Sequence, residues 1–297
     1  MKAAIAMAIL FALTASAQWA KFPTPGVPRG PDGKPNLSAP APKTADGKPD
    51  LSGIWVNYRF PRTQQPQAAA VKPAGAETAN AAFFAEPSDP APLAPPGLAA
   101  AGPPLATFAD VGRNIPGGAP LKPIAAALVK ARIEEHSKDN PDAHCLPLGL
   151  MQLHLHPQPR KIIQTPAVTA ILYEAQGGVR QIFTDGRPLP PSDAQPWWYG
   201  YSVGKWEGDT LVVETTGFRD DVWLDINGTP LTNTGKMTER FRRLNYGSLE
   251  IIVTIEDPEV YTKPYTVRVA QRLMADTELI EFICQENDHA GPHLVGK

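Results

Sequence analysis

The chain has 297 residues, of which 34 are proline, too many for all of it to fold into regular helices and strands. Its formal net charge of −2 provides no basic field, so we expect neither a nucleic acid nor an anionic membrane surface as a partner. Hydrophobic residues make up 42% of the chain, which is enough to build a core.

Residues 1–17 have the pattern of a secretory signal peptide. Lys2 precedes an apolar run at 3–13 that is too short to span a bilayer, and Ala-Ser-Ala at 15–17 fits a cleavage site. A buried N-terminal helix is the alternative, but prolines follow at once and no helix could continue through them. We therefore expect a secreted or periplasmic protein with no later segment inserted in a membrane.

A leader rich in Pro and Gly follows at residues 18–50. It contains Asp-Gly-Lys-Pro-Asn-Leu-Ser at 32–38 and Asp-Gly-Lys-Pro-Asp-Leu-Ser at 46–52. Two copies do not make a repeat fold, so they predict a turn-rich arm along the surface. The second copy leads into the first expected strand, residues 51–60, which contains Trp55.

Two segments of different character separate this strand from the rest of the fold. Residues 61–121 are rich in Ala, Pro and Gly and cannot bury enough apolar surface to offset their ordering entropy. We expect a low-complexity insertion there that is the least ordered part of the chain, and a long excursion over the barrel mouth is the alternative. Residues 122–142 are predicted to be helical, with a helix at 122–137 whose partial apolar stripe includes Ile124 and Leu128.

Residues 143–290 show the period of two that is typical of β-strands. The clearest example is Trp197–Gly217, which predicts a hairpin that turns at Gly208. We expect about ten short strands in all, the last two forming a hairpin of residues 265–273 and 278–284. The predicted fold is mainly β: an antiparallel barrel of calycin or lipocalin type with one helix and a long insertion.

Trp55 gives a second indication of this barrel. Gly53-Ile54-Trp55 resembles the first strand of lipocalin-type barrels, in which the Trp closes one end and an Arg from a late strand packs across it. The resemblance implies that Trp55 is buried against Arg268 or Arg272 of the final hairpin. A Trp on a first strand is also commonly just part of a core.

The chain has two cysteines, Cys145 and Cys284. In an exported protein an even pair most simply forms a disulfide, and two buried free thiols are the alternative. The bridge would tie the segment after the helix to the last expected strand.

Four long strings are distinctive in the second half of the chain. They are TDGRPLP at 184–190, GYSVGKWEGDTLVVET at 200–215, TERFRR at 238–243 and ICQEN at 283–287. Together they resemble a family of exported bacterial proteins of unknown function, over residues 46–60 and 143–290. The resemblance implies no reaction, because none is established for that family, and its general pattern is similar to calycin barrels at the level of the fold alone.

Three residues are candidates for general acid/base catalysis: Asp185, His154 and Glu239. Asp185 shares a turn with Arg187, where the plainer interpretation is a capped turn with an ion pair. His154 and His156 would share one face of an extended segment, a spacing that metal sites on strands use. The prolines that follow them disfavour extended pairing, so we expect packed or surface histidines and no metal site.

The expected ligand contacts are aromatic residues that could form the walls of a pocket and arginines that could anchor a polar group. They are Arg187, Tyr199, Tyr201, Trp206, Trp223, Arg240 and Arg242. Ordinary packing of the aromatics and surface ion pairs of the arginines are the alternative. Glu207 and Asp209, at the tip of the central hairpin, are expected to be solvated.

The sequence contains no nucleophile elbow, P-loop, dinucleotide fingerprint or haem-attachment motif, and we expect no cofactor. The leading hypothesis is a protein that binds a small, partly apolar ligand in the barrel. The second is an enzyme on the same barrel, a hydrolase, lyase or isomerase that uses general acid/base residues. The third is a surface interaction protein whose Pro-rich arm docks a partner.

Overall fold

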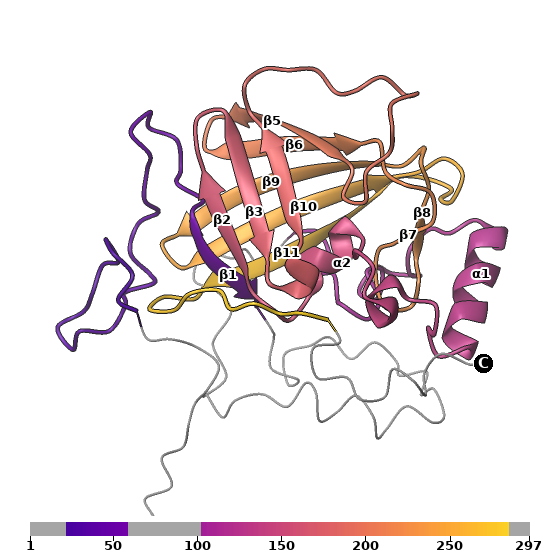
Figure 1. Ribbon diagram of the computed structural model, residues 1–297, viewed down its shortest axis with the longest axis horizontal. Helices are drawn as coiled ribbons and strands as arrows, with labels where there is room; N and C mark the ends of the chain where they lie inside the picture. The colour runs from indigo at the N-terminus through magenta and orange to yellow at the C-terminus, as the bar shows by residue number, and fades with distance from the viewer. Residues whose placement is uncertain (1–21, 59–101, 285–297) are drawn as a thin grey trace, which may run out of the picture.

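The computed structural model describes residues 22–58 and 102–284 (Figure 1). The predicted signal peptide at 1–17 therefore lies outside the described residues, as does most of the predicted insertion. In the described part of the chain, no helix is long and apolar enough to cross a membrane.

Nine strands close into one barrel, in the order β1, β11, β10, β9, β6, β5, β4, β3, β2 (Figure 1). Their bounds are β1 (Gly53–Asn57), β2 (Arg160–Gln164), β3 (Val168–Tyr173), β4 (Val179–Phe183), β5 (Tyr201–Glu207), β6 (Thr210–Thr216), β9 (Lys236–Asn245), β10 (Ser248–Glu256) and β11 (Tyr265–Leu273). The prediction of a mainly β fold with a closed barrel is confirmed. Because β1 pairs with both β2 and β11, the barrel has no free edge.

The prediction of a purely antiparallel barrel is wrong at one pair of strands. β4 and β5 run parallel, with Ile182 opposite Ser202 and Phe183 opposite Val203. The physical reason is the length of the Pro-rich segment 184–200, which carries the chain back along the barrel before β5 begins.

The central hairpin is confirmed. Glu207 pairs with Thr210, so β5 and β6 are joined by a two-residue turn, and its first residue, Gly208, has a φ of 60°. A positive φ at this position costs a glycine little, which is why the turn forms here. Leu211 and Val213 of β6 are fully buried, as the alternation requires for side chains that face the barrel interior.

The predicted final hairpin is wrong, because residues 274–284 contain no strand. β11 already has β10 on one side and β1 on the other, so it has no free hydrogen-bonding edge for a further strand.

The disulfide between Cys145 and Cys284 is confirmed, with 5.6 Å between the two Cα atoms. It fixes the extended C-terminal part of the described chain to the segment that follows the first helix.

Trp55 is fully buried, as expected, and its indole N–H donates to the Leu51 carbonyl over 2.9 Å. The guanidinium that lies over its ring, 4.9 Å from the ring centroid, belongs to Arg243 of β9. The prediction of Arg268 or Arg272 is therefore wrong. Leu273 of β11 is opposite Trp55 and faces inward, so alternation turns the two β11 arginines outward.

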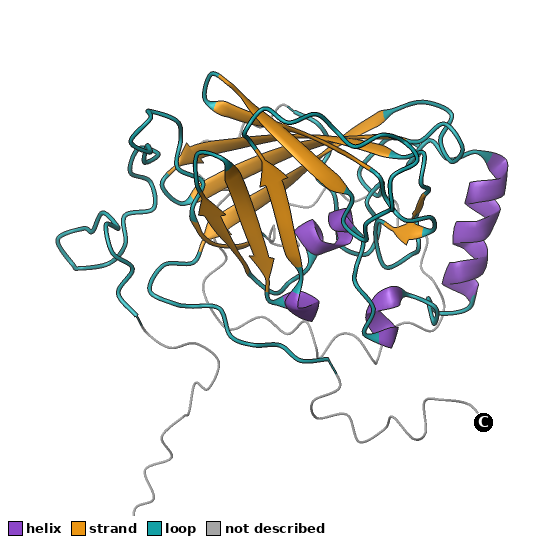
Figure 2. Ribbon diagram, turned by 45° about the horizontal axis from the view of Figure 1, so that its top comes forward, coloured by secondary structure: helices purple, strands orange, loops and turns teal. Residues whose placement is uncertain are grey.

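Two helices and a small sheet lie outside or at one end of the strands (Figure 2). The helices are α1 (Pro123–Glu134) and α2 (Leu150–Leu155), and two short 3₁₀ helices are η2 (Pro141–His144) and η3 (Ala175–Gly177). The small sheet pairs β7 (Val222–Trp223) with β8 (Pro230–Leu231). The predicted helix is thus confirmed as α1, whereas α2 was not predicted.

Residues 102–121 pack on the barrel, so the expectation of an insertion with little order is wrong for this part. Val111 is fully buried, and its backbone N–H donates to Asp225 over 2.8 Å. The backbone carbonyl of Pro104 accepts from the N–H of Arg268 in β11 over 2.8 Å. In the leader, each copy of the repeated motif contains a turn that is closed by an isolated bridge, Arg29 to Pro35 and Lys43 to Pro49.

Candidate functional site

The candidate site begins with α2, a six-residue helix whose side chains are all buried. It starts at Gly149, where a Cβ atom would lie 2.0 Å from the carbonyl oxygen of Trp223, so only glycine lets the chain pass. It ends before Pro157, which cannot continue a helix. Arg160 of β2 fixes this end by donating to the carbonyls of His154 over 2.6 Å and His156 over 3.0 Å.

α2 carries His154 to a charge cluster inside the barrel. His154 Nε2 lies 2.7 Å from Oε1 of Glu239 on β9. Arg180 of β4 forms a bidentate ion pair with the same carboxylate, from Nη1 to Oε1 over 3.0 Å and from Nη2 to Oε2. All three side chains are essentially excluded from solvent.

Arg180 is also held by two hydroxyl groups. Its Nε and Nη2 donate to Ser202 Oγ of β5 over 3.1 and 3.0 Å, and Nη2 donates to Thr215 Oγ1 of β6 over 3.0 Å. The guanidinium therefore links β4 to β5, β6 and β9 across the barrel. Because its donors are committed to fixed partners, the cluster is a rigid frame around the histidine.

The protonation of the cluster follows from burial and charge. Burial raises the pKa of Glu239, but the charge of Arg180 and the hydrogen bonds from His154 and Arg180 outweigh it and lower that pKa to about 2. Burial lowers the pKa of His154 below its ordinary value, opposed only in part by the Glu239 carboxylate. At neutral pH the cluster thus holds an anionic glutamate and a neutral histidine.

These charge states assign the histidine tautomer. An ionised carboxylate only accepts hydrogen bonds, so Nε2 of His154 carries the proton and donates it to Glu239. The other ring nitrogen, Nδ1, then carries a lone pair, and it is buried without a hydrogen-bond partner in the described structure. A fixed imidazole with one free basic nitrogen can accept a hydrogen bond or a proton from a bound molecule.

Other buried polar atoms in the described barrel also lack partners. They include the Tyr173 hydroxyl, Oε1 of Gln152, and both Oε1 and Nε2 of Gln271 on β11. The Tyr173 ring centroid lies 6.3 Å from that of His154, and burial raises the pKa of this phenol to about 12. The tyrosine is therefore neutral near pH 7 and keeps a proton that it can donate.

Two of the three predicted catalytic residues, His154 and Glu239, are brought together by the fold. Asp185 is not part of the cluster: it lies at an exposed turn, where it accepts from Arg187 over 2.7 Å. His156 is buried and points elsewhere, with Nε2 at 3.6 Å from Asp142. Within the described residues, no group of three His, Cys, Asp or Glu side chains could hold a metal ion.

The predicted ligand contacts do not converge in the barrel. Arg240 and Arg242 face outward, where they pair with Glu207 over 3.2 Å and with Glu250 over 2.9 Å. Three of the predicted aromatic residues lie in different parts of the structure. Trp206 packs against the core, Trp223 lies in β7, and Tyr199 is partly buried beside Gly178.

Arg187 and Tyr201, two further predicted contacts, do meet, but on the outer surface. The Arg187 guanidinium lies 3.8 Å from the ring centroid of Phe183, and Tyr201 stacks on that same ring at 5.2 Å. Trp197 extends the stack, 5.1 Å from Tyr201. This arrangement is a surface stack of aromatic rings, separate from the buried cluster.

Sequence reasoning missed Arg180 and Tyr173. Arg180 lies in VRQIF, where the pattern suggests that Val179 faces the core, but Val179 is 54% exposed and Arg180 is 2% exposed. The one available indication was that Arg180 shares a strand face with Ile182.

Comparison with protein-family models, with curated proteins and with solved structures finds no match to this chain.

Proposed function

We propose that this is an exported protein that binds one small, partly apolar molecule inside its barrel, beside His154. The observation that carries the proposal is that buried polar atoms of the barrel form no hydrogen bond in the described structure: His154 Nδ1, the Tyr173 hydroxyl near it, and the Gln271 amide on β11. A buried polar atom without a partner typically costs about 1–3 kcal/mol, so several of them in one barrel favour a molecule that pairs with them.

The chemistry of these atoms defines the class of ligand. His154 Nδ1 accepts a hydrogen bond and the Tyr173 hydroxyl can donate one, which suits a ligand group that both donates and accepts, such as a hydroxyl or an amide. Apolar side chains also face this part of the barrel, with Phe241 6.1 Å from the His154 ring and Ile182 fully buried. The rest of the ligand is therefore apolar.

Export and the calycin-like character of the barrel belong to the same proposal. The disulfide and the N-terminal pattern of charge, apolar run and Ala-Ser-Ala favour an oxidising compartment outside the cytoplasm. The closed barrel, with Trp55 at one end under an arginine of a late strand, supports a resemblance to calycins.

Native mass spectrometry of protein purified from its own host tests the ligand. We expect the wild-type protein to retain a small molecule that Tyr173→Phe and His154→Gln lose, because each variant removes one polar partner. Tyr246→Phe is the matched control, since this hydroxyl contacts the leader at Gly26 and not the barrel interior. A wild-type protein without bound molecule, or equal retention by all variants, would contradict the proposal.

A second function is favoured by the geometry of His154 alone. A carboxylate that orients one imidazole nitrogen and leaves the other free is the arrangement of a general base, as the second hypothesis of a barrel enzyme requires. The base would remove a proton from the bound molecule. Incubation in D₂O tests this: deuterium should enter a carbon position of the retained molecule, and Glu239→Gln should slow the exchange. No exchange beyond that in buffer alone would exclude the removal of a carbon-bound proton by His154.

A further inference from the structure

The outer helix α1 leaves one stripe of its surface unpartnered in the described structure. Ile124, Leu128, Ala131 and Glu135 follow each other at helical spacings of four, three and four residues, so they lie along one face. Ile124 is 87% exposed and Leu128 is 40% exposed, whereas Ala125 alone is buried in this helix. Ile124 and Leu128 lie one helical turn apart, so together they form a small apolar patch on the surface.

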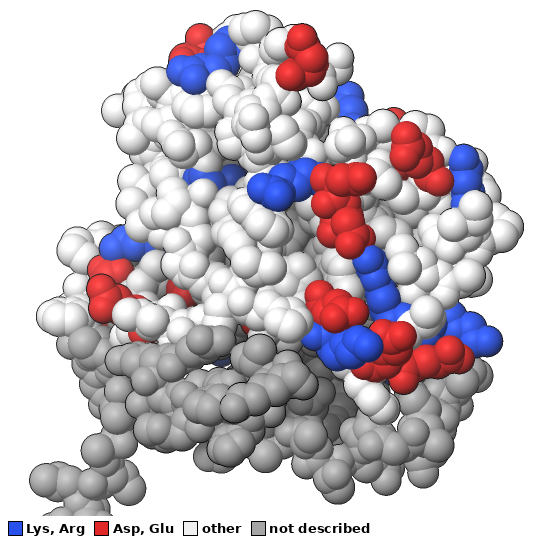
Figure 3. Space-filling model, turned by 45° about the vertical axis from the view of Figure 1, so that its right-hand side comes forward, with Lys and Arg blue, Asp and Glu red and all other residues white. Residues whose placement is uncertain are grey.

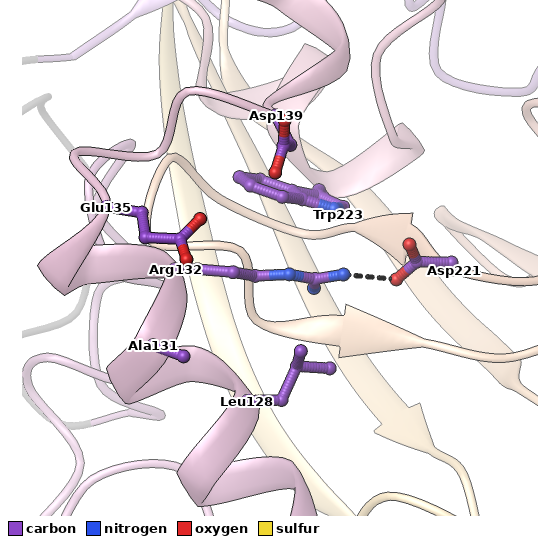
Figure 4. Close-up of a pocket in the computed structure, with 7 residues that line it drawn as sticks. All are labelled: Leu128, Ala131, Arg132, Glu135, Asp139, Asp221 and Trp223. Atoms are coloured by element: carbon purple, nitrogen blue, oxygen red, sulfur yellow. Dashed lines mark hydrogen bonds and ion pairs between the residues drawn. The ribbon is translucent and has the colours of Figure 1, made fainter.

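A groove runs beside this stripe. Its larger part, of about 540 Å³, lies between α1 and three segments, namely 220–221, 230–232 and 259–260. Its smaller part, of about 290 Å³, continues past Leu128 and Asp221 to Trp223 (Figure 4). We call the two parts together the α1 groove. Its floor is apolar where Ala125, Pro230 and Val260 meet, all of them buried.

One wall of the smaller part is a fixed structure. Arg132 extends from α1 toward Asp221 and pairs with it over 2.5 Å, beside the ring of Trp223 (Figure 4). Its guanidinium lies 4.4 Å from the centroid of that ring and donates to the Gly228 carbonyl over 2.7 Å. These contacts hold α1 against β7, so the groove is preformed.

The groove has an acidic rim. Its lining holds five acids, Glu135, Asp139, Asp220, Asp221 and Glu259, and two cations, Lys122 and Arg132. Two of the acids are already in ion pairs, Asp221 with Arg132 and Glu135 with Lys138 over 2.9 Å. Arg132 is committed to Asp221, and Lys122 donates to the Pro258 carbonyl over 2.5 Å. Among the described residues, Asp220 and Glu259 form no ion pair.

We propose that the α1 groove docks a basic, amphipathic segment of a partner protein. Apolar side chains of the segment enter the floor beside Ile124 and Leu128, and its lysines or arginines pair with Asp220 and Glu259. α1 has 12 residues, about 18 Å in length, which matches about three turns of a partner helix. The groove lies outside the barrel, so this inference is independent of the ligand proposal.

The negative charge of the groove rim favours a basic partner over a second copy of this chain. A symmetric contact between two copies would place the same acidic rim against itself, which is unfavourable. Figure 3, with the α1 side turned forward, shows charged side chains of both signs around uncharged surface, as at the polar rim of an interface.

The probe is a fluorescent peptide of about 14 residues, in which leucines and lysines form the two faces of a helix. We expect the full-length protein to bind it, and the same peptide with glutamate in place of lysine to bind about tenfold more weakly or not at all. Ile124→Ser should weaken binding of the lysine peptide about tenfold, with Val179→Ser as control because Val179 is an exposed apolar residue of β4.

The rim is tested by reversing charge. The double variant Asp220→Lys, Glu259→Lys should lose the lysine peptide and bind the glutamate peptide, whereas Asp193→Lys, in the exposed loop before β5, should bind as the wild type does. Equal binding of both peptides to all variants would overturn the proposal. So would a concentration-dependent dimer in sedimentation that Ile124→Ser abolishes, because the groove would then be covered by a second copy.

Discussion

Arg180 is the residue on which the interior cluster depends most. It supplies the positive charge that keeps the buried Glu239 carboxylate ionised, and it joins that carboxylate to two hydroxyl groups. The pair need not add stability relative to an apolar core, because desolvating two charges offsets much of their attraction. Removing one partner of the pair does destabilise the fold, because the other charge is then left buried without a partner.

Arg180→Met should therefore destabilise the fold by about 3–5 kcal/mol, the usual cost of leaving one partner of a buried ion pair unpaired. Urea unfolding followed by tryptophan fluorescence measures this difference. Arg240→Met is the matched control, because Arg240 faces outward and pairs with Glu207 at the surface. Similar losses for the two variants would show that Glu239 is not held as described.

The stability of the fold should decrease as the pH falls below about 6.5. The unfolded chain takes up a proton at His154 near its ordinary pKa of 6.5, whereas burial lowers the pKa in the folded state, so protonation favours unfolding. Glu239 acts in the same direction at lower pH, between its ordinary pKa of 4.5 and its folded value of about 2.

His154→Gln should flatten the first part of this dependence. Between pH 7 and pH 5 we expect the variant to lose about 1–2 kcal/mol less free energy of unfolding than the wild type. His144→Gln, the same substitution at an exposed imidazole, is measured alongside as the matched variant. Parallel curves for wild type and His154→Gln would mean that His154 titrates equally in both states.

The sequence identified His154 and Glu239 one at a time, and could not pair them. They are 85 residues apart, and their meeting depends on a helix that the pattern did not predict. The His-Leu-His spacing suggested an extended segment, whereas the short run between Gly149 and Pro157 forms α2. Tertiary packing of six buried side chains decides that local structure, and propensity alone does not reveal it.

At the scale of elements, alternation predicted the strands best where both neighbours are antiparallel. The inward sets of β6 and β10 follow directly from their period of two. The parallel pair of β4 and β5 was missed because a long loop permits either direction, and its sequence does not say which. The arginine over Trp55 was misassigned for a related reason: the choice depends on which face of β11 points inward.

Trp55 is fully buried and should be essential for the packing of β1. Trp55→Ala removes a fully buried indole, and with it the contact to Arg243, at a typical cost of about 3–5 kcal/mol. Thermal melting should therefore show a large decrease for this variant. Trp197→Ala, at a site that is 37% exposed, should melt close to the wild type, and equal decreases in the two variants would contradict a structural role for Trp55.

At the scale of the whole molecule, the disulfide closes a long loop. It joins residues 139 positions apart and thereby links the segment after α1 to the end of the described chain. The bridge lies outside the barrel strands, so the barrel can keep its hydrogen bonds without it. Its contribution comes mainly from restricting the unfolded chain.

Replacing both cysteines, as in Cys145→Ser with Cys284→Ser, should lower the free energy of unfolding by up to about 4–5 kcal/mol, the chain-entropy estimate for such a loop. The circular dichroism spectrum of the β-sheet should persist at low temperature. Addition of a reductant should shift the melting of the wild type to that of the double variant, and a wild type insensitive to reductant would argue against the bridge.

The closure of the barrel by β1 also constrains the order of folding. Among the described residues β1 is the first strand to be synthesised, yet both of its hydrogen-bonding neighbours, β2 and β11, are synthesised later, and β11 is the last strand of that part of the chain. Local hairpins such as β9–β10 can form as soon as they are made, but β1 must wait until β11 has been synthesised. A nascent or truncated chain that stops before residue 265 would present open edges on both β1 and β10, the kind of edge that recruits other chains into aggregates.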